Sequence, residues 1–329
     1  GDLMLLSMFH LLNGCSLLEV SAIAELGGIA ELSDVAFMKR FEGCAAWFEH
    51  INAEMANGAV CNYELPAWLV GHRVIAIDAS DVVEKGRSGR TYRLHYAMDI
   101  FKMKGIQYRI TGQATGETLS NFTVALGDLF IADRAYGTIN SIAHCLKGGA
   151  DFILRMRKGC FTLYDAEGKT VDLLERLRLL PEGTEADISA FVDTKGMGRM
   201  PVRVCAIRKD KNGIANSRKR LKRRDVRRQT STSKEAVELN DYIVLVTSLG
   251  FEASAADVLG LYRLRWQVEI CFKRMKSLLE YGELPKRREG SVMAWLNGKL
   301  MIALLIEKML SGTDFFPTGQ VSIQKEPVA

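Results

Sequence analysis

The sequence predicts an α/β protein with a mixed-sheet core, a β-rich insertion within that core and a helical region before it. Three observations lead to this class. Apolar residues follow a helical spacing over residues 1–65, and from His72 they change to short β-branched runs. Polar turns separate short strand-like pieces over residues 158–239. The chain has 329 residues, which is enough for two or three domains.

The N-terminal region, residues 1–68, is expected to contain three helices. The first covers Leu5–Leu12, and Ser16 caps the second, which Gly27 and Gly28 end. The third begins at Ser33 and continues through Phe48. Helices joined by short glycine-containing turns are compatible with a helix-turn-helix DNA-binding region, but the pattern is weakly specific and the alternative is a small helical packing domain.

The core is expected over residues 69–157 and 240–310, and its strands are short apolar runs. Two of the runs are closed by aspartates, Asp78 and Asp133. A helix is expected over Ser141–Leu146 between further parallel strands. Together with the three strands before it, these strands make a mixed α/β sheet. The expected strands are Val74–Ile77, Tyr92–Ala97, Gly105–Thr111, Leu129–Ala132, Phe152–Arg155 and Asn240–Leu249.

The insertion, residues 158–239, ends in a strongly basic arm. Residues 208–228 hold eleven Lys or Arg and two Asp, whereas the whole chain has a formal net charge of only +5. One interpretation is a nucleic-acid clamp in which Arg220, Arg223 and Arg224 contact phosphates. The alternative is a solvated loop with no fixed partner.

The stretch Leu261–Lys276 is expected to be one helix with two different faces. At about 100° per residue, four polar side chains share an arc of roughly 60°: Tyr262, Arg265, Glu269 and Lys276. The opposite face is apolar and is expected to face the core, with Leu264, Val268, Cys271, Met275 and Leu278. Trp266 either stacks on a displaced base or packs against the protein. A last helix covers Val292–Leu310, and residues 311–329 are expected to form a loose tail.

Three acidic residues suggest a metal site. Asp78 and Asp133 at strand ends, with Glu269 from the helix, supply hard oxygen ligands of the kind that Mg²⁺ prefers. Two such ions about 4 Å apart support in-line displacement at phosphorus. The alternatives are turn or capping roles for the aspartates and a solvated i, i+4 pair of Glu269 with Lys273.

The spacing Tyr262, Arg265, Glu269, Lys276 resembles the Tyr-Arg-Glu-Lys signature of bacterial insertion-sequence DDE transposases, the cut-and-paste subgroup with a β-rich insertion domain. The stretches VIAIDAS and IADRAYG resemble that family's two aspartate motifs. The resemblance implies a ribonuclease H-like core whose three acids bind two Mg²⁺ ions, with Mn²⁺ able to substitute. It implies cleavage at the element ends and transfer of the 3′-OH ends into target DNA.

The resemblance also implies the partners of the chain. Double-stranded DNA is expected, both terminal repeats and target, and a homodimer on DNA. Residues expected to contact it are Tyr262, Arg265 and Lys276, with Lys273, Trp266 and Arg134 nearby. Two other functions are a related nuclease that only cleaves DNA and an inactive DNA-binding relic.

The composition favours a cytoplasmic protein that does not enter a membrane, and the resemblance implies a bacterial, nucleoid-associated one. Seven scattered cysteines without zinc-like spacing suggest free thiols in a reducing compartment. No signal peptide opens the chain, and no apolar run reaches about 18 residues.

Overall fold

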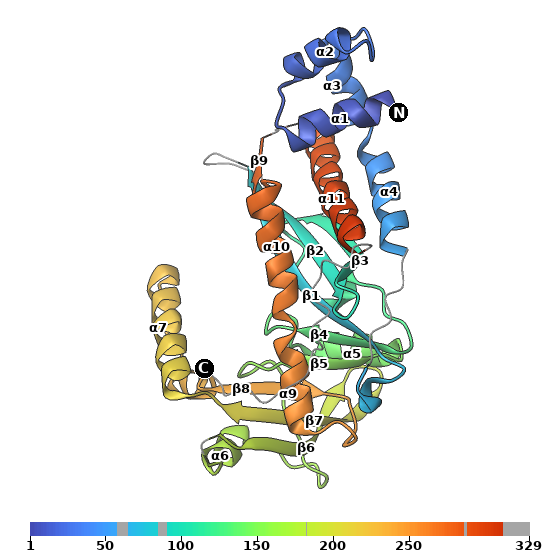
Figure 1. Ribbon diagram of the computed structural model, residues 1–329. Helices are drawn as coiled ribbons and strands as arrows, with labels where there is room; N and C mark the ends of the chain where they lie inside the picture. Colours follow the sequence, from blue (N-terminus) through green and yellow to red (C-terminus); the bar gives the residue numbers. More distant parts are fainter. Residues whose placement is uncertain (58–64, 85–90, 182, 286–287, 312–329) are drawn as a thin grey trace. The chain divides into compact units, whose positions relative to one another are not determined.

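The computed structural model describes residues 1–57, 65–84, 91–181, 183–285 and 288–311 (Figure 1). The chain divides into two compact units. Among the described residues, unit 1 contains 1–57, 79–84, 91–116, 267–285 and 288–311, and unit 2 contains 65–78, 117–181 and 183–266. The expected loose tail lies outside the described residues, except for Ser311.

Unit 1 contains a cluster of helices that pack on α11 (Glu289–Ser311). The other helices are α1 (Asp2–Leu12), α2 (Leu17–Leu26), α3 (Asp34–Glu42) and α4 (Ala45–Asn57). Contacts join α11 to α1, α3 and α4. The approach is close at Gly298, where a Cβ atom would lie 2.5 Å from Leu11 Cδ1. Among the described helices, α11 is long and apolar enough to cross a membrane, but most of it is buried, as in the core helix of a globular unit.

Two expectations about these helices have different outcomes. Ser16 caps α2 as predicted, and a capping box with Glu19 completes the start of the helix. The single helix predicted from Ser33 through Phe48 is wrong. It ends at Glu42, Gly43 is its C-cap, and a second helix begins at Ala45. The glycine interrupts the helix although the apolar spacing continues across it.

The strands of unit 1 form the order β3–β2–β1, with β9 also paired to β1. Their bounds are β1 (Arg73–Glu84), β2 (Thr91–Asp99), β3 (Lys104–Gly112) and β9 (Glu283–Leu284). The β2–β3 hairpin is antiparallel, and β9 runs parallel to the end of β1, where Val83 pairs with Glu283. The expected strands Tyr92–Ala97 and Gly105–Thr111 are confirmed.

Unit 2 is a mixed α/β unit in which the strands follow the order β1–β4–β5–β8–β7–β6. The first three strands are parallel and the remaining pairs are antiparallel. The strands are β4 (Asp128–Ala132), β5 (Asp151–Arg155), β6 (Glu185–Thr194), β7 (Gly198–Arg208) and β8 (Tyr242–Thr247). The helices include α5 (Ile139–Lys147), α6 (Leu173–Arg178), α8 (Lys234–Leu239) and α9 (Ala255–Arg263), with short 3₁₀ turns at Ala67–Leu69 and Leu119–Asn121.

The strand β1 is longer than the sequence suggests. The apolar run predicts an end at Asp78, but the strand continues to Glu84. The apolar run ends at Asp78 because burial becomes partial there, and the extended backbone does not end with it. Asp133, in contrast, directly follows the last residue of β4, as predicted.

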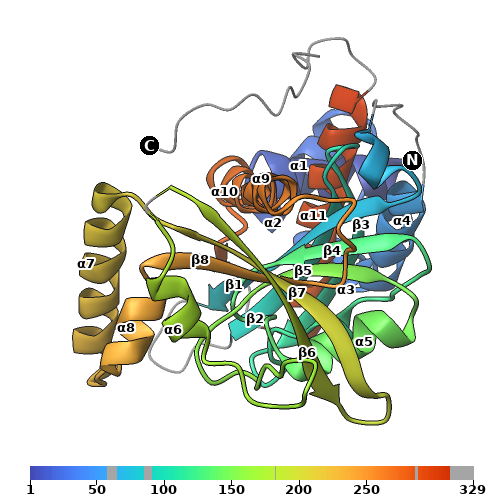
Figure 2. The same cartoon turned by 90° about the horizontal axis from the view of Figure 1, so that it is seen from below.

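The basic arm is a helix, α7 (Lys211–Arg228), in which no residue is buried. Asp210 caps its N-terminus, and Gln229 ends it in the left-handed conformation, with φ of 51°. Arg218 forms a bidentate ion pair with the buried carboxylate of Asp241, and the Thr232 amide donates to Asp225. Figure 2 shows α7 beside α8, the helix that precedes β8. The arm is therefore a defined, anchored element.

The C-terminal helical stretch is broken. The prediction of one helix over Leu261–Lys276 is wrong, because α9 ends at Arg263 and α10 (Trp266–Leu278) begins after a turn. Val268, Cys271 and Met275 are buried as predicted. Leu278 was expected in the core, but it is 74% exposed, since it lies in the last turn of the helix.

Candidate active site and nucleic-acid interface

Two of the predicted acids, Asp78 and Asp133, lie side by side in unit 2. The strands β1 and β4 are parallel, and Ala76 pairs with Ile131. The pairing ends there, and Asp78 and Asp133 each follow two residues later, so the same register continued along the chain would place their backbones about 4.8 Å apart. Equivalent positions in parallel strands present their side chains on the same face. The register thus predicts that the two carboxylates are neighbours.

Backbone and cationic groups surround this pair of carboxylates. The amide of Ala135 donates a 2.7 Å hydrogen bond to Asp133 Oδ1. Arg265 places Nη1 3.9 Å from Asp78 Oδ2. The same guanidinium lies 5.8 Å from the centroid of the Tyr262 ring. A cation therefore reduces the mutual repulsion of the two carboxylates.

The turn between α9 and α10 explains where the signature residues lie. Tyr262, at the end of α9, is only 7% exposed, and burial raises the pKa of its hydroxyl. It does not share the solvent-facing arc that one continuous helix would have given it. Arg265 lies in the turn, partly buried near Asp78, and Trp266 at the start of α10 is 51% exposed.

The other predicted residues of this stretch belong to unit 1. Glu269, Lys273 and Lys276 are exposed positions of α10. Within the described part of the chain, no three His, Cys, Asp or Glu side chains are grouped as a metal site. The structure thus brings Asp78 and Asp133 together, and the role of Glu269 as the third ligand remains a prediction.

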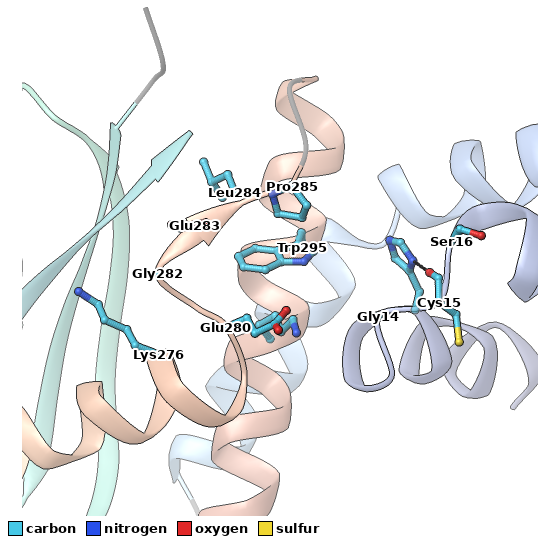
Figure 3. A pocket seen from close by; sticks show the side chains of 12 residues that line it. Gly14, Cys15, Ser16, Lys276, Glu280, Gly282, Glu283, Leu284, Pro285 and Trp295 are labelled. Atoms are coloured by element: carbon cyan, nitrogen blue, oxygen red, sulfur yellow. Dashed lines mark hydrogen bonds between the residues drawn. The ribbon is translucent and has the colours of Figure 1, made fainter. Parts of the chain in front are cut away.

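Lys276 contributes to a pocket of about 680 Å³ in unit 1. Figure 3 shows Lys276, Glu280 and Trp295 around it, with Ser16 from the N-terminal helices on the other side. Lys299, 5.5 Å from the Trp295 ring, also lines the pocket, and burial lowers the pKa of its ammonium. Two lysines, Lys276 and Lys299, and two glutamates, Glu280 and Glu283, line its walls, so the pocket has no strong excess of positive charge.

Arg134 takes part in a cluster that the sequence did not reveal. Its Nη1 donates a 2.8 Å hydrogen bond to Asn240 Oδ1. Lys209 Nζ donates to the backbone carbonyl of the same asparagine. Burial and the neighbouring Arg155 lower the pKa of Arg134 to about 10. Lys209 and Asn240 carry no motif, so only their position in the sheet identifies them.

The arginines of α7 divide into two groups. The helix contacts the rest of unit 2 through the partly buried positions Ile214, Leu221 and Asp225. Arg220 and Arg223 are exposed and lie roughly on the opposite side by helical spacing. Arg224 Nη2 instead bonds Asp225 and Thr232. The outer face of α7 is therefore a cationic surface on a helical scaffold.

A family model described as "Transposase DDE domain" matches residues 70–305, which is most of the chain. The chain belongs to this family and is a DNA transposase, an enzyme that acts on DNA. It is 29% identical over 322 residues to the putative transposase InsL for insertion sequence element IS186A of Escherichia coli (strain K12), covering 95% of this chain and 85% of that protein.

A second relative has the same level of identity. The transposase for insertion sequence element IS421 of Escherichia coli is 29% identical over 320 residues, covering 94% of this chain and 85% of that protein. The expectation of an insertion-sequence DDE transposase is confirmed. Among solved structures, a piggyBac transposase synaptic complex with hairpin DNA aligns with a TM-score of 0.42 and 13% identity, over 73% of this chain and 47% of that chain.

Proposed function

We propose that this transposase cleaves DNA at the ends of its element and transfers the 3′-OH ends into target DNA, with Asp78, Asp133 and Glu269 as ligands of two divalent ions. The observation that supports this most directly is the equivalent position of Asp78 and Asp133 on parallel strands. Adjacent carboxylates are ligands that suit Mg²⁺, with Mn²⁺ as a substitute. Such ions activate water and stabilise a leaving oxygen at phosphorus.

The residues around the carboxylates have roles of their own in this proposal. Arg265 balances the charge of Asp78 and can bind a DNA phosphate bidentately. The buried ring of Tyr262 supports the guanidinium from one side. Lys273 and Lys276, with the exposed Trp266, extend the DNA surface along α10. This assigns the chain to the subgroup with the Tyr-Arg-Glu-Lys signature.

The outer face of α7 is proposed to bind the backbone of double-stranded DNA. Its support is the exposed charge of Arg220 and Arg223 on a helix held by the Arg218–Asp241 ion pair. The proposal includes a homodimer on DNA, a ribonuclease H-like core over residues 69–157 and 240–310 with residues 158–239 as its insertion, and a nucleoid-associated place in the cytoplasm.

A cleavage and joining assay tests the proposed chemistry. The assay combines a duplex bearing the element end, Mg²⁺ and a target plasmid. Joined product is expected from the wild-type protein, whereas nicks alone would favour a nuclease, and binding without cleavage would favour an inactive relic. Asp133→Asn and Glu269→Gln are expected to abolish both products while DNA binding persists. Full activity in either variant contradicts the metal assignment.

A salt titration tests the α7 surface. The double variant Arg220→Ala/Arg223→Ala is expected to weaken duplex binding and to lower the slope of log affinity against log salt by about 0.9 for each lost phosphate contact. Lys195→Ala, an exposed change in the β6–β7 hairpin, is the matched control and should leave the slope unchanged. An unchanged slope in the double variant would exclude α7 as a DNA surface.

A further inference from the structure

Four chain segments of unit 2 end at one edge of its sheet. The parallel strands β4 and β5 end there, at Ala132, which Asp133 follows, and at Arg155. Because β8 is antiparallel to both β5 and β7, its first residues lie at the same edge, as does the end of β7. Lys209 directly follows β7, and Asn240 precedes β8. The topology therefore places Lys209 and Asn240 on the same edge as the proposed catalytic aspartate.

Asn240 joins the two cations at this edge. Its side-chain oxygen accepts the hydrogen bond from Arg134, and its backbone carbonyl accepts the one from Lys209. Asn240 is only 8% exposed, and the amide of Lys209 donates a 3.0 Å bond to the carbonyl of Asp241. Both cations are thus held in place by a buried turn.

Two carboxylates offset part of the positive charge at this edge, Asp133 beside Arg134 and Asp241 near Lys209. The Nε atoms of Arg134 and Arg155 are buried and find no acceptor among the described residues. The Asp241 carboxylate is already occupied by Arg218. Buried N–H donors without acceptors are rare in folded proteins, and they suggest an oxygen-rich ligand.

The pKa of Lys209 reflects the same concentration of positive charge. Burial, followed by the charges of Arg155 and Arg134, lowers the pKa of its ammonium to about 8, and Arg220 on α7 acts in the same direction. Asp241, before β8, is the carboxylate that opposes this shift. A bound anion would remove much of the repulsion, so binding of an anion and protonation of Lys209 favour each other.

We propose that Lys209 and Arg134 form a binding site for a phosphate of the DNA backbone beside Asp133, with Asn240 as the residue that positions both. The inference rests on the proposed DNA-processing function. A phosphodiester fits because it brings one negative charge and several acceptor oxygens, which match an ammonium and a guanidinium. The site lies at the base of α7, since Lys209 is followed by the helix cap Asp210. One DNA strand could therefore contact α7 and this site in succession.

The experiment measures the affinity of the full chain for a short fluorescent duplex by anisotropy, without divalent ions, between about pH 7 and pH 9, on either side of the Lys209 pKa of about 8. Wild-type affinity is expected to fall by roughly tenfold over this range, because Lys209 loses its proton. Lys209→Arg keeps its charge and should bind tightly with a flat profile. Lys209→Gln should bind about tenfold more weakly at pH 7, also with a flat profile.

Two control variants distinguish a contact at this site from a general loss of positive charge. Lys211→Gln removes an exposed charge in the first turn of α7, and it should retain the wild-type pH profile. Arg134→Gln should weaken binding as Lys209→Gln does, and the two changes together should cost less than their sum. Circular dichroism of each variant confirms folding. The proposal is overturned if Lys209→Gln keeps the wild-type affinity and pH profile.

The outcome is independent of the catalytic proposal. Asp133→Asn tests the metal site through cleavage, whereas the Lys209 variants are tested by binding without divalent ions. If Asp133→Asn fails to cleave DNA but binds it with the same pH dependence as the wild type, and the Lys209 variants weaken binding as described, both proposals are supported. Loss of the Lys209 effect with intact cleavage would contradict only the phosphate site.

Discussion

The ion pair between Arg73 and Asp128 is expected to hold the register that aligns the two proposed catalytic aspartates. Arg73 and Asp128 pair directly across β1 and β4, five residues before Asp78 and Asp133 on each strand. Arg73 Nε donates a 2.8 Å hydrogen bond to Asp128 Oδ1, and Asp128 is only 1% exposed. Replacing Arg73 with methionine would leave a buried carboxylate that, among the described residues, keeps a hydrogen bond from the amide of Ala125.

The magnitude follows from this burial. Removing one partner of a buried pair costs about 3–5 kcal/mol, but the Arg73 side chain is 43% exposed, so we expect a loss of about 2–3 kcal/mol in the free energy of unfolding. The corresponding fall in Tm is roughly 4–12 °C. Calorimetry of Arg73→Met, Asp128→Asn and the double variant measures it.

The double variant provides the decisive comparison. Asparagine at position 128 keeps an oxygen for the Ala125 amide but carries no charge, so the double variant should recover most of the stability lost in Arg73→Met. Cleavage should fall with the single change, because a register shift by one residue turns Asp78 to the other face of β1. If Arg73→Met unfolds within about 0.5 kcal/mol of the wild type, the pair does not hold the register.

Three further predictions concern other contacts. Burial raises the pKa of Glu307, so the free energy of unfolding should fall as the pH rises through that pKa. Thermal unfolding at several pH values should show a flatter pH dependence for Glu307→Gln. An unaltered pH dependence in this variant would contradict the prediction. Arg218→Gln breaks the ion pair that anchors α7, and hydrogen exchange should report about 1 kcal/mol less protection in α7 alone; unchanged protection would contradict the anchor. Gly105→Ala should destabilise by about 1–3 kcal/mol, since its Cβ would lie 1.9 Å from the Tyr96 hydroxyl oxygen, whereas Gly116→Ala, with open space around it, is the control in the same melting assay.

Local patterns predicted the elements whose sequence and burial agree. The buried strand β4 and the helix α5 were predicted correctly, because each has a single unbroken apolar pattern along its length. Breaks within an amphipathic pattern were missed, at Gly43 and at the turn before Trp266, because apolar spacing can continue across a turn. The basic arm was recognised by charge alone, whereas its anchoring includes the Arg218–Asp241 pair, which joins segments distant in the sequence.

The sequence by itself determined the residue types of the candidate site and their spacing along the chain, which were sufficient to identify the DDE transposase family. Only the tertiary structure decided that Asp78 and Asp133 occupy equivalent positions, since register depends on the pairing of two strands. It alone brought Lys209 and Arg134 to one asparagine. The reason is physical: charge and periodicity are local properties of a chain, whereas the neighbours of a buried cation are set by the order of strands in a sheet.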